Sequence, residues 1–409
     1  MSLRPLSLES AGQGQTVRAE AGAGPSVLTE EGEAPLVGLQ GFHPGWFGAV
    51  MGTAIVGIVA FSGPGGLKAL DPALRHFGQV MVVLASVLAV ALAVPYIGRL
   101  VVHPRSALED LKDPVVGALY GTLPGGILVL AAAAAAVGPS LVGAAAAKDL
   151  VLGLAWAGVP LAFVASVAFA FVLFVGKGLA PEVVNGGWFI PPVVNIVVPL
   201  ALVPLVPGSS PSTARLLVAL SYAFWGMGLL LYVLVMSMLH ERLVLHPLPS
   251  AALAPSLWIG LGPIGVGSLG LIKMVPASLG VLGTGGEAVK SLSLLTGTAL
   301  WGFGAWWFCA SVLLLARYLR RGPLPYGLGW WGFTFPLGAF TSATLAVAEN
   351  WGSGLLDDVG AALFVLLVVF WAVVAGRTIW AARTGEAWRR VGSRPQAPSV
   401  VVPKVEVLG

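Results

Sequence analysis

Ten apolar segments, each long enough to form a membrane-spanning helix, follow one another between residues 41 and 382. The hydrocarbon layer of a bilayer is about 30 Å thick, which takes roughly 20 helical residues to cross. Backbone groups in lipid must be satisfied within the protein, so such segments are expected to be helices. With 57% hydrophobic and only 10% charged residues, the chain is predicted to be an all-α integral membrane protein. The ten segments cover about 45–62, 78–99, 117–138, 150–176, 187–206, 213–239, 254–275, 291–316, 327–348 and 358–381.

The flanking regions and the charges predict the topology. Residues 1–40 are small, polar and acidic, and residues 383–409 are also expected to form a disordered cytoplasmic tail, leaving one domain at 41–382. If the spans alternate in direction, 16 of the 22 Lys and Arg residues fall on the side of the N-terminus. Basic residues are enriched in cytoplasmic loops. Both termini are therefore predicted to be cytoplasmic, in a multi-pass protein of the cell membrane.

Proline and glycine are distributed unevenly over the ten segments. The odd-numbered segments carry Gly48, Gly52 and Gly57 in the first, Pro124 in the third, Pro191, Pro192 and Pro199 in the fifth, Pro255 and Pro263 in the seventh and Pro336 in the ninth. Among the even-numbered ones only the fourth has a proline at mid-span, Pro160. Interrupted helices are tolerated where protein encloses them or where they line a cavity. We therefore expect five helical hairpins with the odd helices around a central pore; the alternative is that Gly and Pro are simply common in membrane helices.

The odd segments carry no Asp, Glu, Lys, Arg or His at mid-span, which argues against a proton or cation carrier. An anion could instead be stabilised by helix N-termini at the proline breaks. Side chains that could assist are Thr53, Thr122, Asn195, Ser268, Thr334 and Thr341. For each of these, the alternative is a hydrogen bond to a neighbouring helix. No phosphate-binding loop and no zinc-ligand spacing is found, so neither an enzyme nor a metal or cofactor site is predicted.

Four stretches resemble the tellurite-resistance/dicarboxylate transporter family of the voltage-dependent anion channel superfamily. They are "HPGWFGAVMGTAIVGIVA" at 43–60, "GWFIPPVVNIVVP" at 187–199, "PSLWIGLGPIGVGSLGL" at 255–271 and "WWGFTFPLGAFTSATLA" at 330–346. The family includes tellurite-resistance protein A, malate and sulfite permeases and slow-type anion channels. The resemblance implies ten helices as five hairpins, a pore within each protomer, a homotrimer and permeation by small anions.

The resemblance also implies a gate. Phe335, directly before the proline in "TFPL", matches the position at which an aromatic ring closes the pore of the family. An apolar ring in a narrow channel excludes water and raises the barrier for an ion that must shed its hydration. A helix break at Pro336 could aim that ring inward.

Three functions remain open from the sequence. The first is a gated anion channel or uniporter, which the absence of mid-span ionisable residues favours. The second is a secondary carrier or exporter of sulfite or of malate-like dicarboxylates. The third is a membrane scaffold or enzyme subunit without transport, which the interrupted odd segments disfavour.

Overall fold

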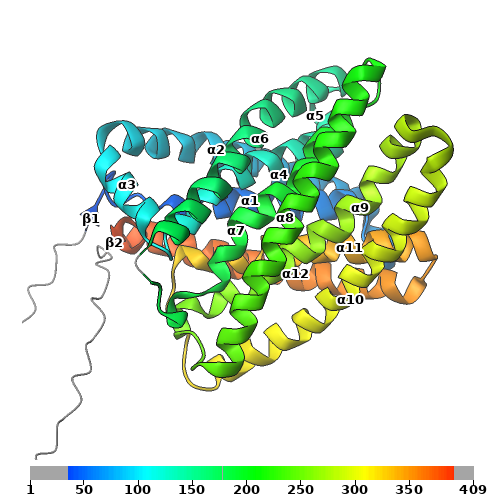
Figure 1. The fold of residues 1–409 in the computed structure, drawn as a ribbon. Helices are drawn as coiled ribbons and strands as arrows, with labels where there is room; N and C mark the ends of the chain where they lie inside the picture. The colour runs from blue at the N-terminus through cyan, green and yellow to red at the C-terminus, as the bar shows by residue number, and fades with distance from the viewer. Residues whose placement is uncertain (1–35, 177, 391–409) are drawn as a thin grey trace, which may run out of the picture. The chain divides into compact units, whose positions relative to one another are not determined.

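The computed structural model describes residues 36–176 and 178–390 of the chain (Figure 1). The tails predicted at 1–40 and 383–409 therefore lie largely outside the described residues. Within the described part, nine helices are long and apolar enough to cross a membrane. The expected all-α membrane fold is confirmed; the exact count of ten spans stays a prediction.

Each inner span is built from two pieces, a 3-10 helix followed by an α-helix. The apolar runs alone predict one continuous helix, because an uninterrupted apolar sequence does not distinguish the two periods. The pairs are η1 Pro44–Trp46 with α1 Phe47–Phe61, η3 Gly117–Gly121 with α4 Thr122–Ala136, η5 Gly186–Phe189 with α7 Ile190–Leu202, η7 Ala251–Gly260 with α9 Leu261–Leu282, and η9 Leu328–Phe333 with α11 Phe335–Trp351. In the last pair Thr334 separates the pieces, so the ninth predicted segment is not one continuous helix.

The prolines explain where the α-helices begin. Pro124 and Pro263 are the third residues of α4 and α9, and Pro336 is the second residue of α11. Pro191 and Pro192 occupy the same first turn in α7. The first turn needs no intrahelical N–H donor, so proline is tolerated there without the cost of about 3 kcal/mol that it has inside a helix.

The five inner spans form a closed ring. The α-helices contact one another in the order α1, α4, α7, α9, α11 and back to α1, and the 3-10 helices form a second ring in the same order. The two rings mean that all five spans run in the same direction. Glycines permit the closest approaches: a Cβ on Gly265 of α9 would lie only 2.5 Å from the backbone nitrogen of Phe340 in α11.

Five longer helices pack outside this ring, each against the inner helix that precedes it in the chain. They are α2 Asp71–Val102, α6 Ala144–Val175, α8 Pro211–Leu245, α10 Gly286–Leu319 and α12 Gly354–Thr384. In their most apolar stretches 17% to 33% of residues are buried, against 61% to 83% in α1, α4, α7 and α9 with their 3-10 helices. The prediction of inner odd helices and outer even helices is thus confirmed. Interior proline does not mark the inner set, since α2 contains Pro95 and α6 contains Pro160.

Short elements complete the described chain. Strand β1 (Leu36–Val37) pairs antiparallel with β2 (Arg389–Arg390), so the two ends of the helical unit lie side by side. A chain that crosses the membrane an even number of times begins and ends on the same side, which agrees with this pairing. The remaining elements are η2 Gly65–Leu70, α3 Pro104–Lys112, α5 Gly138–Val142, η4 Pro181–Val183, η6 Val203–Leu205, η8 Gly283–Gly285 and η10 Glu386–Trp388.

Candidate functional site

A cavity of about 300 Å³ lies within the ring of inner helices. Every lining residue belongs to an inner span or to η6, the direct continuation of α7. The lining consists of Ile55 and Ile58 from α1; Val129, Ala132, Ala135 and Ala136 from α4; Val197, Leu200, Val203 and Pro204 from α7 and η6; Val266, Leu269 and Lys273 from α9; and Phe335, Ala339 and Ser342 from α11. All five inner helices thus contribute to one axial cavity.

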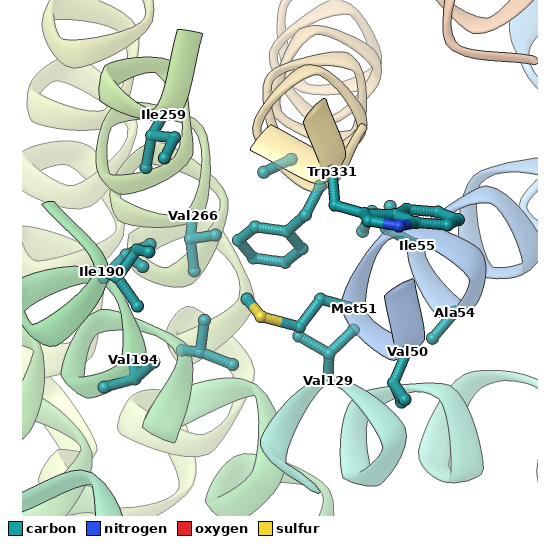
Figure 2. Packing of buried hydrophobic residues seen from close by; sticks show 14 of the residues in the cluster. Val50, Met51, Ala54, Ile55, Val129, Ile190, Val194, Ile259, Val266 and Trp331 are labelled. Carbon is teal, nitrogen blue, oxygen red and sulfur yellow. The ribbon is translucent and has the colours of Figure 1, made fainter. Parts of the chain in front are cut away.

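Helical periodicity explains how each helix faces this cavity. In α9, Val266, Leu269 and Lys273 recur at intervals of three and four residues, which places them on one face. The lining residues of α11 have the same spacing. In Figure 2 the side chains of Met51 and Val129 approach the same central space from different inner helices. The walls are apolar apart from Ser342 and Lys273.

The cavity is closed at one end and open at the other. Phe335, Val129 and Val266 are buried, whereas Ala136 and Lys273 are exposed. Phe335 is the first residue of α11, at the junction between the ring of α-helices and the ring of 3-10 helices. The open end lies where α4 and α9 approach their C-terminal parts. Phe335 therefore forms part of the closed end.

Glycines of α9 and α4 lie against bulky side chains at this end of the cavity. A Cβ placed on Gly262 of α9 would lie 3.7 Å from Cε1 of Phe335 and 3.7 Å from Cβ of Pro336. One on Gly125 of α4 would lie 2.8 Å from the Met51 sulfur. Glycine at position 125 thus permits close packing of Met51, while the Phe335 ring lies beside Gly262 at an ordinary contact distance.

Phe335 differs from the neighbouring aromatic residues of the same segment. Phe333 packs edge to face against Trp258 and Phe370, the latter from outer helix α12. Phe340 stacks on Trp301 and Phe308 of outer helix α10. Neither Phe333 nor Phe340 lines the cavity. Of the three phenylalanines in this segment, Phe335 is the one that borders the axial space.

The six polar residues proposed as anion contacts are buried, and none lines the cavity. Thr341 and Thr334 donate to carbonyl oxygens of their own segment, and Thr122 donates to Leu119 and Pro44 carbonyls. Two are bonded to outer helices: Ser268 donates to the Gly297 carbonyl of α10, and Thr53 accepts a hydrogen bond from the Trp371 indole of α12.

Asn195 is the sixth of these polar residues. Its amide nitrogen donates to the Pro191 carbonyl, while its buried Oδ1 has no hydrogen-bond partner among the described residues. The anion-contact role of all six therefore stays a prediction. The predicted pore prolines lie just outside the cavity lining: Pro124, Pro191, Pro192, Pro263 and Pro336 in first turns, and Pro199 inside α7.

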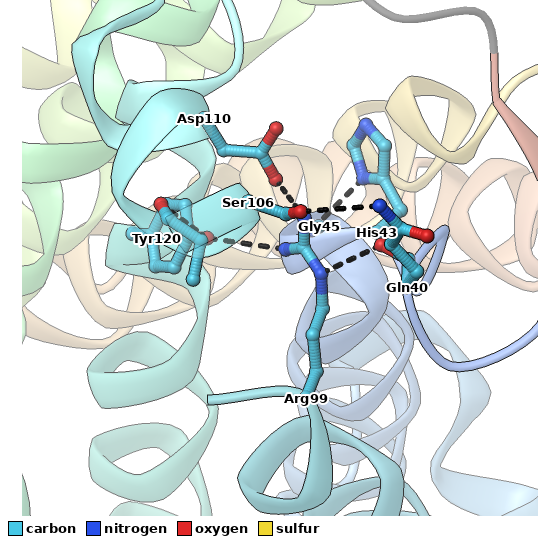
Figure 3. Close-up of polar contacts among 8 residues, drawn as sticks. Gln40, His43, Gly45, Arg99, Ser106, Asp110 and Tyr120 are labelled. Carbon is cyan, nitrogen blue, oxygen red and sulfur yellow. Dashed lines mark hydrogen bonds and ion pairs between the residues drawn. The ribbon is translucent and has the colours of Figure 1, made fainter. Parts of the chain in front are cut away.

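A buried polar network near the start of α1 was not predicted from the sequence. The guanidinium of Arg99, at the end of α2, pairs with the carboxylate of Asp110 in α3 at 2.5 Å (Figure 3). It also donates to the Gln40 carbonyl at 3.0 Å and the Tyr120 hydroxyl at 3.1 Å. Arg99 is 3% exposed. The structure makes Arg99 a buried link between α2, α3 and η3.

The fold defines a multi-pass membrane protein in which five inner helices enclose an axial cavity and five outer helices surround them. Residues 41–379 match the SLAC1 family, described as voltage-dependent anion channel, and the chain belongs to this family. The resemblance drawn from the four sequence stretches is therefore confirmed.

Several relatives extend the comparison. An uncharacterized transporter of Methanocaldococcus jannaschii is 32% identical over 88% of this chain and 99% of its own length. The sulfite efflux pump of Arthroderma otae is 26% identical over 86% of this chain and 94% of its own length. The malic acid transport protein of Schizosaccharomyces pombe is 24% identical over 53% of this chain and 51% of its own length. The family identifies the chain as a membrane transport protein for small anions rather than an enzyme.

Proposed function

We propose that each protomer conducts small anions passively through the axial cavity and that Phe335 gates this path. The observation that carries the proposal is the position of Phe335 at the closed end of a cavity lined by all five inner helices. An anion that enters this apolar space must lose part of its hydration. The ring adds to that barrier by excluding water from the closed end of the cavity.

The path has few groups to hold an anion tightly. The cavity wall has no acidic side chain among its lining residues, and its only basic one lies at the open end. The N-terminal ends of α4, α7 and α9 lie at the junction of the two rings, but the N–H groups of Thr122, Ile190 and Leu261 there already donate to carbonyls of the preceding 3-10 helices, so they would bind an anion only weakly. Weak binding of this kind suits rapid passage.

A coupled carrier is the second candidate, because relatives named as a sulfite efflux pump and a malic acid transport protein align with this chain. Coupling to protons would require a group that titrates along the path. Flux of chloride, nitrate, sulfite and malate into proteoliposomes, with and without a pH gradient, separates the two. Uptake that follows the anion gradient alone supports the channel, while uptake that needs the pH gradient supports the carrier.

The gate is tested by Phe335→Ala, with Phe333→Ala and Phe340→Ala as matched controls that remove the same ring from sites outside the cavity. We expect Phe335→Ala to raise anion flux at least tenfold at normal expression, which corresponds to about 1.4 kcal/mol of barrier. The two controls should mainly lower stability. Unchanged or abolished flux in folded Phe335→Ala protein would show that Phe335 is not the gate.

We further propose a homotrimer in the cell membrane with both termini in the cytoplasm. The pairing of Leu36–Val37 with Arg389–Arg390 supports a common side for the ends, and the charge distribution supports the cytoplasmic one. Tags at either end should be digested only after permeabilisation of the cell. Native mass measurement of the purified protein should give three chains; a conducting monomer would refute the trimer.

A further inference from the structure

Lys273 is the one charged residue in the cavity lining, all of which falls within the described chain. It lies on the α9 face that also carries Gly262, Val266 and Leu269. Gly262 is next to the Phe335 ring, and Lys273 follows it by eleven residues, a rise of about 16 Å at about 1.5 Å per residue. The charge therefore lies at the open end of the cavity, opposite the constriction.

The ammonium group is available to an approaching ion. Lys273 is exposed, and among the described residues it forms no ion pair within 4.0 Å. Lys290, a second exposed lysine after the end of α9, lies outside the cavity lining and is 4.0 Å from Glu287. Glu349, on α11, is exposed beyond Ser342 but does not line the cavity. Of these three charged residues, Lys273 is thus the one that borders the cavity.

We propose that Lys273 captures anions at the mouth of the pore and favours divalent over monovalent anions. This rests on the proposed anion conduction. A charge at a mouth with low-dielectric walls raises the local concentration of counter-ions. Electrostatic energy scales with the charge of the ion. A threefold gain in the local concentration of a monovalent anion therefore becomes about a ninefold gain for a divalent anion.

Ionic strength provides a second signature. The screening length is about 30 Å at 0.01 M salt and about 3 Å at 1 M. The contribution of Lys273 to flux should therefore be present at low salt and nearly absent at high salt. A lysine that only stabilises the fold or contacts lipid headgroups would not make the flux of one anion class depend on salt in this way.

The test compares Lys273→Gln with the control Lys290→Gln, each in the wild-type and the Phe335→Ala chain. Fluxes of chloride, nitrate, sulfate and malate into proteoliposomes are measured at about 0.01 M and about 1 M ionic strength. We expect Lys273→Gln to lower chloride and nitrate flux about threefold and sulfate and malate flux about ninefold at low salt, with less than twofold effects at high salt. Lys290→Gln should leave all fluxes within twofold.

A cysteine variant adds a readout that survives a change in folding yield. Lys273→Cys is prepared in a Cys309→Ala background, because Cys309 is the single cysteine of the chain. Modification with a positively charged thiol reagent should restore the divalent flux, whereas a negatively charged reagent should lower it further. Equal effects of the two reagents, or equal losses for sulfate and chloride, would overturn the role of Lys273 while leaving conduction intact. Absence of any anion flux in both starting chains would overturn the proposed function and this inference with it.

Discussion

Two glycines three residues apart on α9 offer a direct test of the gate geometry. A Cβ on Gly262 would lie 3.5 Å from Cγ2 of Val193 and 3.7 Å from Cε1 of Phe335, which are ordinary contact distances. Alanine should therefore fit among the tertiary neighbours of position 262. The gain of about 0.5–1 kcal/mol from replacing glycine by alanine is opposed by the restriction that Pro263 places on a helical residue before it, so stability should stay close to that of the wild type.

The added methyl should nevertheless lower the flux. It would touch the edge of the Phe335 ring and hinder the movement that opens the path. We expect Gly262→Ala to reduce anion flux about threefold, equivalent to about 0.6 kcal/mol of barrier, in a protein that melts close to the wild-type temperature. The assay is proteoliposome flux together with thermal unfolding followed by the fluorescence of the 14 tryptophans.

The matched control is Gly265→Ala on the same helix. Its Cβ would lie 2.5 Å from the backbone nitrogen of Phe340 and 2.6 Å from the carbonyl carbon of Ala339, so α9 and α11 must separate. Overpacking of this kind costs about 1–3 kcal/mol and should lower the melting temperature. Adding Gly262→Ala to Phe335→Ala tests whether the methyl acts through the ring, because the double variant has no ring to hinder. An equal loss of flux with and without the Phe335 ring would show that the methyl does not act through it.

Two further predictions follow from buried features. Arg99→Met should destabilise the protein by about 3–5 kcal/mol because it removes the guanidinium that pairs with the buried carboxylate of Asp110; adding Asp110→Leu should recover part of this loss in thermal unfolding, and strictly additive losses would contradict the pairing. Pro192→Ala or Pro263→Ala supplies an N–H that can extend the α-helix back into the 3-10 segment, so it should change anion flux more than Pro160→Ala in outer helix α6. Equal flux changes at the three positions would remove the link between these helix starts and the pore.

The sequence predicts much of the architecture because its main signals are local. Lengths of apolar runs reflect the thickness of the bilayer. The third, fifth, seventh and ninth segments, singled out by their prolines, are inner helices, although Pro95 and Pro160 show that proline also occurs inside outer helices. Pro336 shows the limit of this reasoning. A proline in a long apolar run suggests a kinked helix, but the structure starts a new α-helix there, after a separate 3-10 piece. Nothing in an all-apolar run distinguishes these outcomes.

The sequence also does not show which buried polar side chains face the pore. On an inner helix that is apolar on every face, periodicity does not indicate which face meets the axis. Ser268 and Thr53 were therefore reasonable pore candidates, yet both are bonded to outer helices. Arg99 and Asp110 lie eleven residues apart in the chain, and only the folding of α3 against the end of α2 brings them together.

Chain composition and the spacing of apolar runs were sufficient to establish a membrane protein of paired helices, since hydrophobic burial in a bilayer depends on residue type and segment length alone. The rotation of each helix about its own axis, and with it the list of residues that face the pore, depends on contacts between helices far apart in the chain. Gly265 against the backbone of Ala339 and Phe340 is one such contact, at which α9 and α11 approach closely. The identity of a glycine in the sequence does not say which partner it meets.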